Sequence, residues 1–219
     1  MNRFDEKLAR GERPLGCCTT FTDSRVAELA AAAGFDFVWV DGEHGEYDRA
    51  SARGMIRAVQ AQGMAALYRV PECRGDHVRR ICDFRPDAVI VPMAMDETDV
   101  AYAAANCAEG VRLVVQLEHV SAVRRLDEIL RVPGLWSVLV GPYDLTASMG
   151  KEGCWHDPEV AATFDSVCAR VKAAGLPLGV YTERDFGLWK ARGCDYFSVK
   201  NDTNAMLAGF RMAQTVCRG

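Results

Sequence analysis

Chemically reactive side chains follow apolar segments at several points of this 219-residue sequence. Residues 41–44 (DGEH) come after one apolar segment, and residues 141–144 (GPYD) come after another. Arg69 and residues 116–118 (QLE) end two further segments. An imidazole, a guanidinium and several carboxylates that meet in one cleft can move protons, bind anions and hold a metal ion.

Two carboxylates, Glu118 and Asp144, indicate a metal site. Gln116 and Glu118 are two residues apart on a predicted strand and therefore face the same side. Glu118 and Asp144, at the same ends of adjacent strands, can share a hard divalent ion such as magnesium or manganese, with water as further ligand. The alternative for each carboxylate is a helix cap or an ion pair with an arginine.

His44 and Arg69 are the candidates for proton transfer and anion binding. His44 lies in a polar stretch flanked by glycines, and imidazoles titrate near neutral pH, which suits a general acid or base. The alternative is a hydrogen-bonded surface histidine. Arg69 ends an apolar strand and needs an anionic partner, which is either a substrate carboxylate or an internal one, Asp41 or Asp83.

The elements that must position these residues alternate regularly along the chain. Eight β-branched apolar runs predict strands at 14–20, 35–40, 64–70, 88–92, 112–118, 137–140, 177–180 and 196–199. Segments of helical spacing predict helices at 24–33, 48–62, 75–84, 97–107, 120–130, 159–174, 184–191 and 204–218.

This alternation predicts a single (β/α)8 TIM barrel over residues 1–219, because parallel strands require crossover connections. The length is close to the lower limit of about 200 residues for this fold. A doubly wound open sheet is the alternative. In a barrel the carboxyl ends of all strands share one face, which would bring the polar residues together.

Composition excludes several partners and compartments. With 26 basic and 30 acidic residues the net charge is −4, so a phosphate-binding footprint for nucleic acid is absent from the sequence. No apolar run reaches the roughly 18 residues of a membrane span, and the charged start (MNRFDEK) lacks a secretory signal. The nine cysteines include no CxxC pair. We therefore interpret them as small apolar core residues and not as zinc ligands or disulfides. We therefore expect a cytoplasmic protein without nucleic-acid or membrane partners.

The spaced motifs resemble the HpcH/HpaI aldolase family, metal-dependent class II aldolases that act on pyruvate and related 2-oxo acids. The similarity spans nearly the whole chain and includes 33–36 (AGFD), 41–44 (DGEH), 69–71 (RVP), 91–93 (VPM), 115–118 (VQLE), 126–130 (LDEIL) and 141–145 (GPYDL).

The resemblance implies a (β/α)8 barrel and a divalent ion (Mg²⁺, Mn²⁺ or Co²⁺) at the positions of Glu118 and Asp144. It also implies that Gln116, Tyr143 and Asp144 contact the 2-oxo acid. Members of this family form homo-oligomers, and the last helix, about 204–218, is implied to pack on a neighbouring subunit of a trimer or hexamer.

For catalysis the resemblance implies His44 as the base and Arg69 as the group that stabilises an enolate oxygen. Asp83 or Asp41 would orient His44 and raise its basicity.

Two departures from the family pattern concern the substrate pocket. The family normally carries a longer insert between Pro92 and Glu118, whereas only residues 96–111 lie there in this chain. Lys200 stands where similar sequences have a small residue, and it is a candidate to bind an anionic group of the substrate or to form a Schiff base. The alternative is a solvated lysine in a loop.

The sequence thus predicts a metal-dependent lyase that forms or cleaves a carbon–carbon bond between a 2-oxo acid such as pyruvate and an aldehyde, through a metal-stabilised enolate. One alternative is a decarboxylase of the oxaloacetate type on the same site. Another is a degenerate barrel that only binds a ligand or a protein partner.

Overall fold

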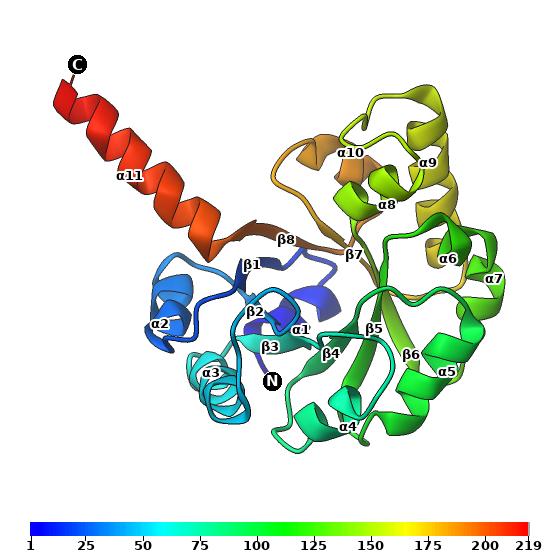
Figure 1. Cartoon of the computed structure of the whole chain (residues 1–219), viewed down its shortest axis with the longest axis horizontal. Coiled ribbons are helices and arrows are strands. Elements are labelled where there is room, and N and C mark those ends of the chain that lie inside the picture. Colours follow the sequence, from blue (N-terminus) through cyan, green and yellow to red (C-terminus); the bar gives the residue numbers. More distant parts are fainter. Residues whose placement is uncertain (219) are drawn as a thin grey trace.

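The apolar segments form a closed barrel of eight parallel strands, each paired with the next in chain order and the last with the first. The computed structural model describes residues 1–218 and confirms the (β/α)8 barrel (Figure 1). The strands are β1 (Leu15–Thr19), β2 (Phe37–Asp41), β3 (Ala65–Arg69), β4 (Ala88–Val91), β5 (Arg112–Leu117), β6 (Leu135–Val140), β7 (Leu178–Tyr181) and β8 (Tyr196–Asn201).

Helices precede, connect and follow these strands. They are α1 (Arg3–Ala9), α2 (Arg25–Ala32), α3 (Arg49–Ala61), α4 (His77–Cys82), α5 (Glu97–Asn106), α6 (Val120–Arg124), α7 (Leu126–Ile129), α8 (Pro142–Ser148), α9 (Pro158–Ala173), α10 (Phe186–Ala191) and α11 (Asp202–Arg218). The prediction of one helix over 120–130 is wrong, because Arg125 leaves helical geometry and separates α6 from α7. Within residues 1–218, no helix combines the length and the apolar content needed to cross a bilayer.

Helix α1, which the sequence did not predict, closes the end of the barrel where the strands begin. Phe4 is fully buried there, and its ring centroid lies 5.2 Å from that of Phe37 and 5.4 Å from that of Tyr196. The Asn2 side chain caps α1 by accepting a hydrogen bond from the backbone N–H of Asp5. This apolar plug leaves the opposite end of the barrel, where the strands finish, as the open face.

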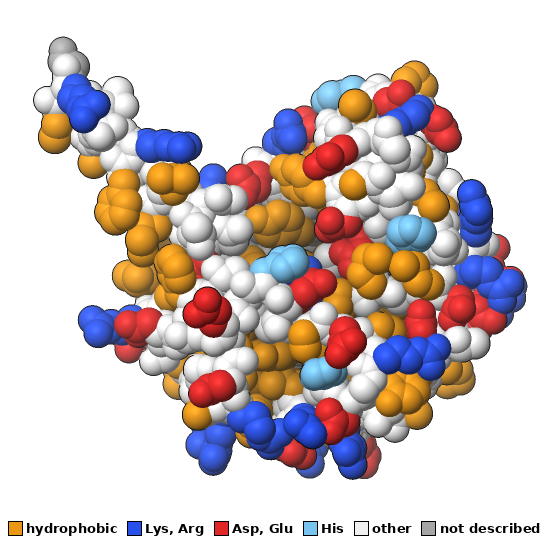
Figure 2. Space-filling model, viewed as in Figure 1, with side chains coloured by type: hydrophobic (Ala, Val, Ile, Leu, Met, Phe, Trp, Pro, Cys, Tyr) orange, Lys and Arg blue, Asp and Glu red, His pale blue; other side chains and the backbone are white. Residues whose placement is uncertain are grey.

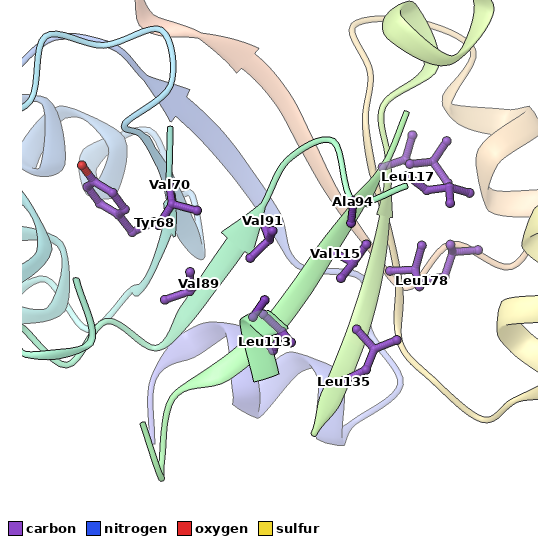
Figure 3. Close-up of a cluster of buried hydrophobic side chains, with 14 of the residues drawn as sticks. Tyr68, Val70, Val89, Val91, Ala94, Leu113, Val115, Leu117, Leu135 and Leu178 are labelled. Carbon is purple, nitrogen blue, oxygen red and sulfur yellow. The ribbon is translucent and has the colours of Figure 1, made fainter. Parts of the chain in front are cut away.

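Side chains along each strand alternate between the barrel interior and the layer beneath the helices. Figure 3 shows part of the outer layer, with Val91, Val115 and Leu117 on neighbouring strands. The inner cluster includes Phe37, Leu67, Ile90, Val114, Leu139 and Tyr196. Because this alternation continues to the strand ends, the last inward positions fall on the open face.

Helix α11 extends away from the barrel, and none of its described residues is buried (Figure 1). Apolar side chains project from it into solvent (Figure 2): Met206, Leu207, Phe210, Met212 and Val216. At the base of α11 lies a groove of about 540 Å³, lined mainly by apolar side chains from β1, α2 and β8. The flank of β8 and β1 therefore lacks the packed helix that covers the other strands.

Packing inside the barrel predicts that Gly16→Ala destabilises the fold. A Cβ at position 16 would overlap the buried Phe37 ring, and overpacking of this kind costs about 1–3 kcal/mol. Gly54 on α3 has no atom within 4 Å of such a Cβ, so Gly54→Ala serves as control and should stabilise by up to about 1 kcal/mol. Urea unfolding of the three proteins measures the difference, and equal stability of the Gly16→Ala variant and the wild type would contradict this packing.

Candidate active site

A cleft of about 180 Å³ opens where the strands end. It is lined by Cys18, Trp39, Asp41, His44, Arg69, Gln116, Gly141, Pro142, Tyr143, Asp144, Tyr181 and Asn201. Most of the residues singled out in the sequence therefore meet at one place.

Arg69 is bound on three sides by carboxylates and an aromatic ring. Its Nε donates to Asp41 Oδ1 at 2.8 Å, its Nη2 to Asp41 Oδ2 at 2.5 Å, and its Nη1 lies 2.6 Å from Glu43 Oε2. Its Cζ lies 4.9 Å above the Trp39 ring. Burial alone would lower the pKa of Arg69, but the hydrogen bonds and charge of Asp41 outweigh this effect and raise it. Of the two internal carboxylates considered as partners of Arg69, Asp41 and Asp83, the structure shows the pair with Asp41.

Asp41 also shapes the loop that carries His44. Its Oδ1 accepts the backbone N–H groups of Glu43 at 3.0 Å and His44 at 3.3 Å. The His44 ring itself is 68% exposed, and its Nε2 lies 3.9 Å from Glu43 Oε2, beyond hydrogen-bond distance. Asp41 thus positions the backbone of His44 and not its imidazole.

Asp83 lies elsewhere. It caps the end of α4, on the outside of the barrel, and its exposed carboxylate lies 3.3 Å from Arg49 Nη2. It is absent from the cleft lining, because it follows a helix and not a strand. Within one copy of the chain, Asp83 therefore does not orient His44.

Glu118 is a buried carboxylate without a cationic partner among residues 1–218. It is 3% exposed, and it accepts hydrogen bonds from the Met93 backbone N–H (2.7 Å) and from Gln116 Nε2. Met93 adopts φ 48°, a left-handed backbone that is unusual for a residue with a side chain and that brings its N–H to Glu118. Burial raises the pKa of Glu118 to about 7; the Met93 hydrogen bond opposes this rise, and the Asp144 charge adds to it.

The residues around Glu118 fit a hard divalent cation. Asp144 lines the cleft from the first turn of α8, and across residues 1–218 neither carboxylate forms an ion pair with a lysine or arginine. Gly141 borders the site, and a Cβ there would approach Glu118 Oε2 to 3.2 Å and Gln116 Nε2 to 3.1 Å. The described chain has no cluster of three or more Asp, Glu, His or Cys suited to a metal. Two carboxylates with open positions suit Mg²⁺ or Mn²⁺, which retain water ligands.

Lys200, predicted to contact substrate, does not line the cleft. The pairing of β1 with β8 shifts register between Gly16 and Cys18, so that Cys18 pairs with Asn201. Such a bulge changes the direction of a side chain. Lys200 therefore lines the groove at the base of α11 and lies 3.4 Å from Glu183 Oε2, while Asn201 lines the cleft.

Sequence reasoning missed the wall formed by Cys18, Trp39 and Tyr181, and it missed Glu43 as the second partner of Arg69. The two-residue period was a usable signal for Trp39, which precedes Asp41 by two positions on β2. The bulge that places Asn201 in the cleft has no such signal.

Comparisons with known proteins find relatives in sequence and in fold. A family model described as HpcH/HpaI aldolase/citrate lyase matches residues 17–185. The hydroxypyruvate/pyruvate aldolase of Roseovarius nubinhibens is 28% identical, over 94% of this chain and 93% of that protein. The protein of the same name from Sagittula stellata is 30% identical, over 92% of each. The crystal structure of an HpcH/HpaI aldolase/citrate lyase family protein from Burkholderia cenocepacia covers 100% of both chains at 24% identity and a TM-score of 0.88, a likeness of fold.

The raised pKa of Glu118 predicts a pH-dependent effect of Glu118→Gln in metal-free protein. The folded state favours the neutral acid, so this contribution is fully present below the unfolded pKa of about 4.3 and is lost as pH rises through about 7. Without metal, the variant should therefore be more stable than the wild type at pH 8, by about 3 kcal/mol, and nearly equal to it at pH 4, below the unfolded pKa.

Thermal unfolding in EDTA at both pH values measures this difference. Glu28→Gln, which changes an exposed glutamate on α2, is the control and should have no effect at either pH. A Glu118→Gln variant less stable than the wild type at pH 8 would show that the carboxylate is not destabilised by its burial.

Proposed function

This chain belongs to the HpcH/HpaI aldolase/citrate lyase family and is a carbon–carbon lyase of the aldolase type, and we propose that it acts next to the keto group of a 2-oxo acid such as pyruvate. The observation that carries the proposal is a pair of carboxylates without a cationic partner within residues 1–218: Asp144 lines the cleft with Arg69 and His44, and Glu118 lies behind the cleft residues Gln116 and Gly141. An aldehyde is the second substrate.

Glu118 and Asp144 would hold the divalent cation, Mg²⁺, Mn²⁺ or Co²⁺. Such an ion supplies positive charge that polarises the keto group of a 2-oxo acid. Met93 and Gln116 keep the Glu118 carboxylate in place through their hydrogen bonds, and Gly141 leaves room beside it.

Arg69, Gln116 and Tyr143 would bind the 2-oxo acid. Asp41 and Glu43 fix the guanidinium of Arg69, which faces the developing negative charge on the keto oxygen with little reorganisation. Gln116 Oε1 accepts from Arg69 Nη1 at 3.3 Å, so the two side chains form one unit of the cleft wall.

His44 would move the proton at the carbon next to the keto group. Its ring lines the cleft and is mostly exposed, so it can exchange protons with both substrate and solvent. The hydrogen bond from the His44 backbone N–H to Asp41 holds the backbone from which this ring reaches the cleft.

Two further proposals concern the setting of the enzyme. All nine cysteines are free, which suits a reducing compartment such as the cytoplasm.

The exposed apolar side chains of α11 and the groove at its base support a homo-oligomer, a trimer or hexamer, in which α11 of one copy covers the open flank of another.

Chelation is expected to abolish activity. The carboxylates Glu118 and Asp144 would then lose the ion that they hold, and EDTA-treated protein should neither form nor cleave aldols of pyruvate. Addition of Mg²⁺, Mn²⁺ or Co²⁺ should restore product formation. In a separate test with metal present, His44→Asn should lower kcat by about 10²–10⁴-fold, because the variant lacks the group that moves the proton. Full activity without metal would overturn the proposal, and carbon dioxide release from oxaloacetate without aldol chemistry would assign the site to decarboxylation.

The oligomer depends on the apolar side of α11. Met206 and Phe210 are four residues apart and share one side of the helix, so the double substitution Met206→Asp and Phe210→Asp should convert the oligomer to monomers. Size-exclusion chromatography with light scattering measures the mass. Thr215→Asp, nearly on the opposite side of α11, is the control and should leave the mass unchanged; a monomeric wild type would contradict the proposal.

A further inference from the structure

Two cysteines far from the cleft lie against each other in the helix layer outside the barrel. Cys82 is the last residue of α4, and Cys107 directly follows α5, which packs against α4. The Cys82 sulfur accepts a hydrogen bond from the Cys107 thiol and another, at 3.5 Å, from the backbone N–H of Ala108. The Cys107 sulfur also lies 3.3 Å from the carbonyl oxygen of Val111. The two sulfurs are therefore neighbours where the segments after α4 and α5 meet.

The surroundings of this pair fix both segments and favour charge on Cys82. Arg85 adopts φ 54° just after α4, and its Nη1 donates to the Glu109 carbonyl oxygen at 2.9 Å, which ties the two segments together. The hydrogen bond with Cys107, more than that from Ala108, lowers the pKa of Cys82, although burial opposes this effect. The pKa of Cys107 is raised, so this thiol keeps its proton. Cys82 is thus the nucleophile of the pair, because the thiolate and not the thiol reacts.

A second cysteine pair has the same contact but no access to solvent. Cys168 on α9 and Cys194 before β8 are also hydrogen-bonded to each other, and they are 1% and 0% exposed. Cys82 is 3% exposed, but Cys107 is only half-buried. A small reagent can therefore approach the first pair from the side of Cys107, whereas the second pair is sealed in the core.

Two thiols in contact, without a third ligand, favour disulfide chemistry over metal binding. Residues 1–218 contain no cluster of three or more Asp, Glu, His or Cys suited to a metal, whereas structural zinc sites use four ligands. A disulfide requires only that two neighbouring sulfurs close to about 2.05 Å. Cys82 ends its helix, and Cys107 already has an extended backbone with ψ 127°, so this closure need not unwind α4 or α5.

We propose that Cys82 and Cys107 form a reversible disulfide when the protein meets a hydroperoxide, and that this link ties the end of α4 to the end of α5. The Cys82 thiolate attacks the O–O bond and becomes a sulfenic acid, while the leaving oxygen takes up a proton. Cys107 then attacks the Cys82 sulfur, the S–S bond forms, and the second oxygen leaves as water with the Cys107 proton. The sulfurs lose two electrons in total, and these reduce the peroxide. Dithiols reverse the link, as for the transient redox-sensing disulfides of reducing compartments.

Oxidation of the reduced protein with a small excess of hydrogen peroxide tests this inference independently of the reaction in the cleft. Remaining thiols are alkylated in urea, and a protease that cleaves before aspartate then separates Cys82 from Cys107 at Asp83. We expect one cross-linked peptide pair, which contains Cys82 and Cys107 and disappears on addition of dithiothreitol. Cys168 and Cys194 should be recovered as alkylated thiols, because peroxide does not reach them.

The link should also stabilise the fold. It closes a loop of about 25 residues, so oxidation should raise the Tm by roughly 5–10 °C. Cys107→Ser should abolish both the cross-link and this shift, and it should leave Cys82 as a sulfenic acid that dimedone traps. Cys154→Ser, which removes an exposed cysteine elsewhere in the chain, is the matched control and should change neither result.

Three outcomes would overturn the inference. Absence of the Cys82–Cys107 link at peroxide concentrations that oxidise the exposed Cys154 would show that the two sulfurs cannot react with each other. Equal oxidation of Cys168 and Cys194 would show that exposure does not select between the two pairs. A lower Tm of the linked protein would show that the disulfide strains the ends of α4 and α5.

Discussion

The bidentate ion pair between Asp41 and Arg69 is the interaction on which the rest of the cleft depends. The two residues are register partners at the ends of β2 and β3, so the backbone pairing of the barrel itself brings them together. Asp41 then holds the loop to His44 through two backbone N–H groups, and Arg69 stacks on Trp39. Removal of either partner would leave a buried charge, which costs several kcal/mol.

This pair also determines how charge is distributed in the cleft. Because Asp41 and Glu43 already neutralise Arg69, no basic side chain in the described chain is left to pair with Glu118 and Asp144. A buried, unpaired carboxylate is unfavourable unless it binds a proton or a cation. The pKa of Glu118 is raised for this reason, because burial disfavours its charged form. A bound proton or cation would therefore stabilise this part of the cleft, and the proposed divalent ion would supply that positive charge.

The fold could be predicted from the sequence because strands and helices alternate along the chain. Much of the site could be predicted because side chains along a strand alternate with a period of two residues. Alternation along β5 correctly placed Gln116 and Glu118 on one side, where they share a hydrogen bond. Alternation fails where the backbone becomes irregular: the bulge of β8 exchanges Lys200 for Asn201 in the cleft, and no local pattern signals it. Asp83 lies outside the cleft of one copy of the chain, because it follows the short helix α4 and not a strand, and motif similarity does not signal that placement.

The cleft and the groove at the base of α11 lie on two sides of the same strands, β1 and β8. Cys18 and Asn201 line both cavities, and Lys200 and Val199 line the groove immediately beside them. A helix packed in the groove would contact β1 and β8 from outside and restrict the backbone that carries Cys18 and Asn201. Because the bulge of β8 decides that Asn201 and not Lys200 lines the cleft, the fit of that helix would bear on the shape of the cleft. Packing in the groove and the lining of the cleft are therefore linked through β1 and β8.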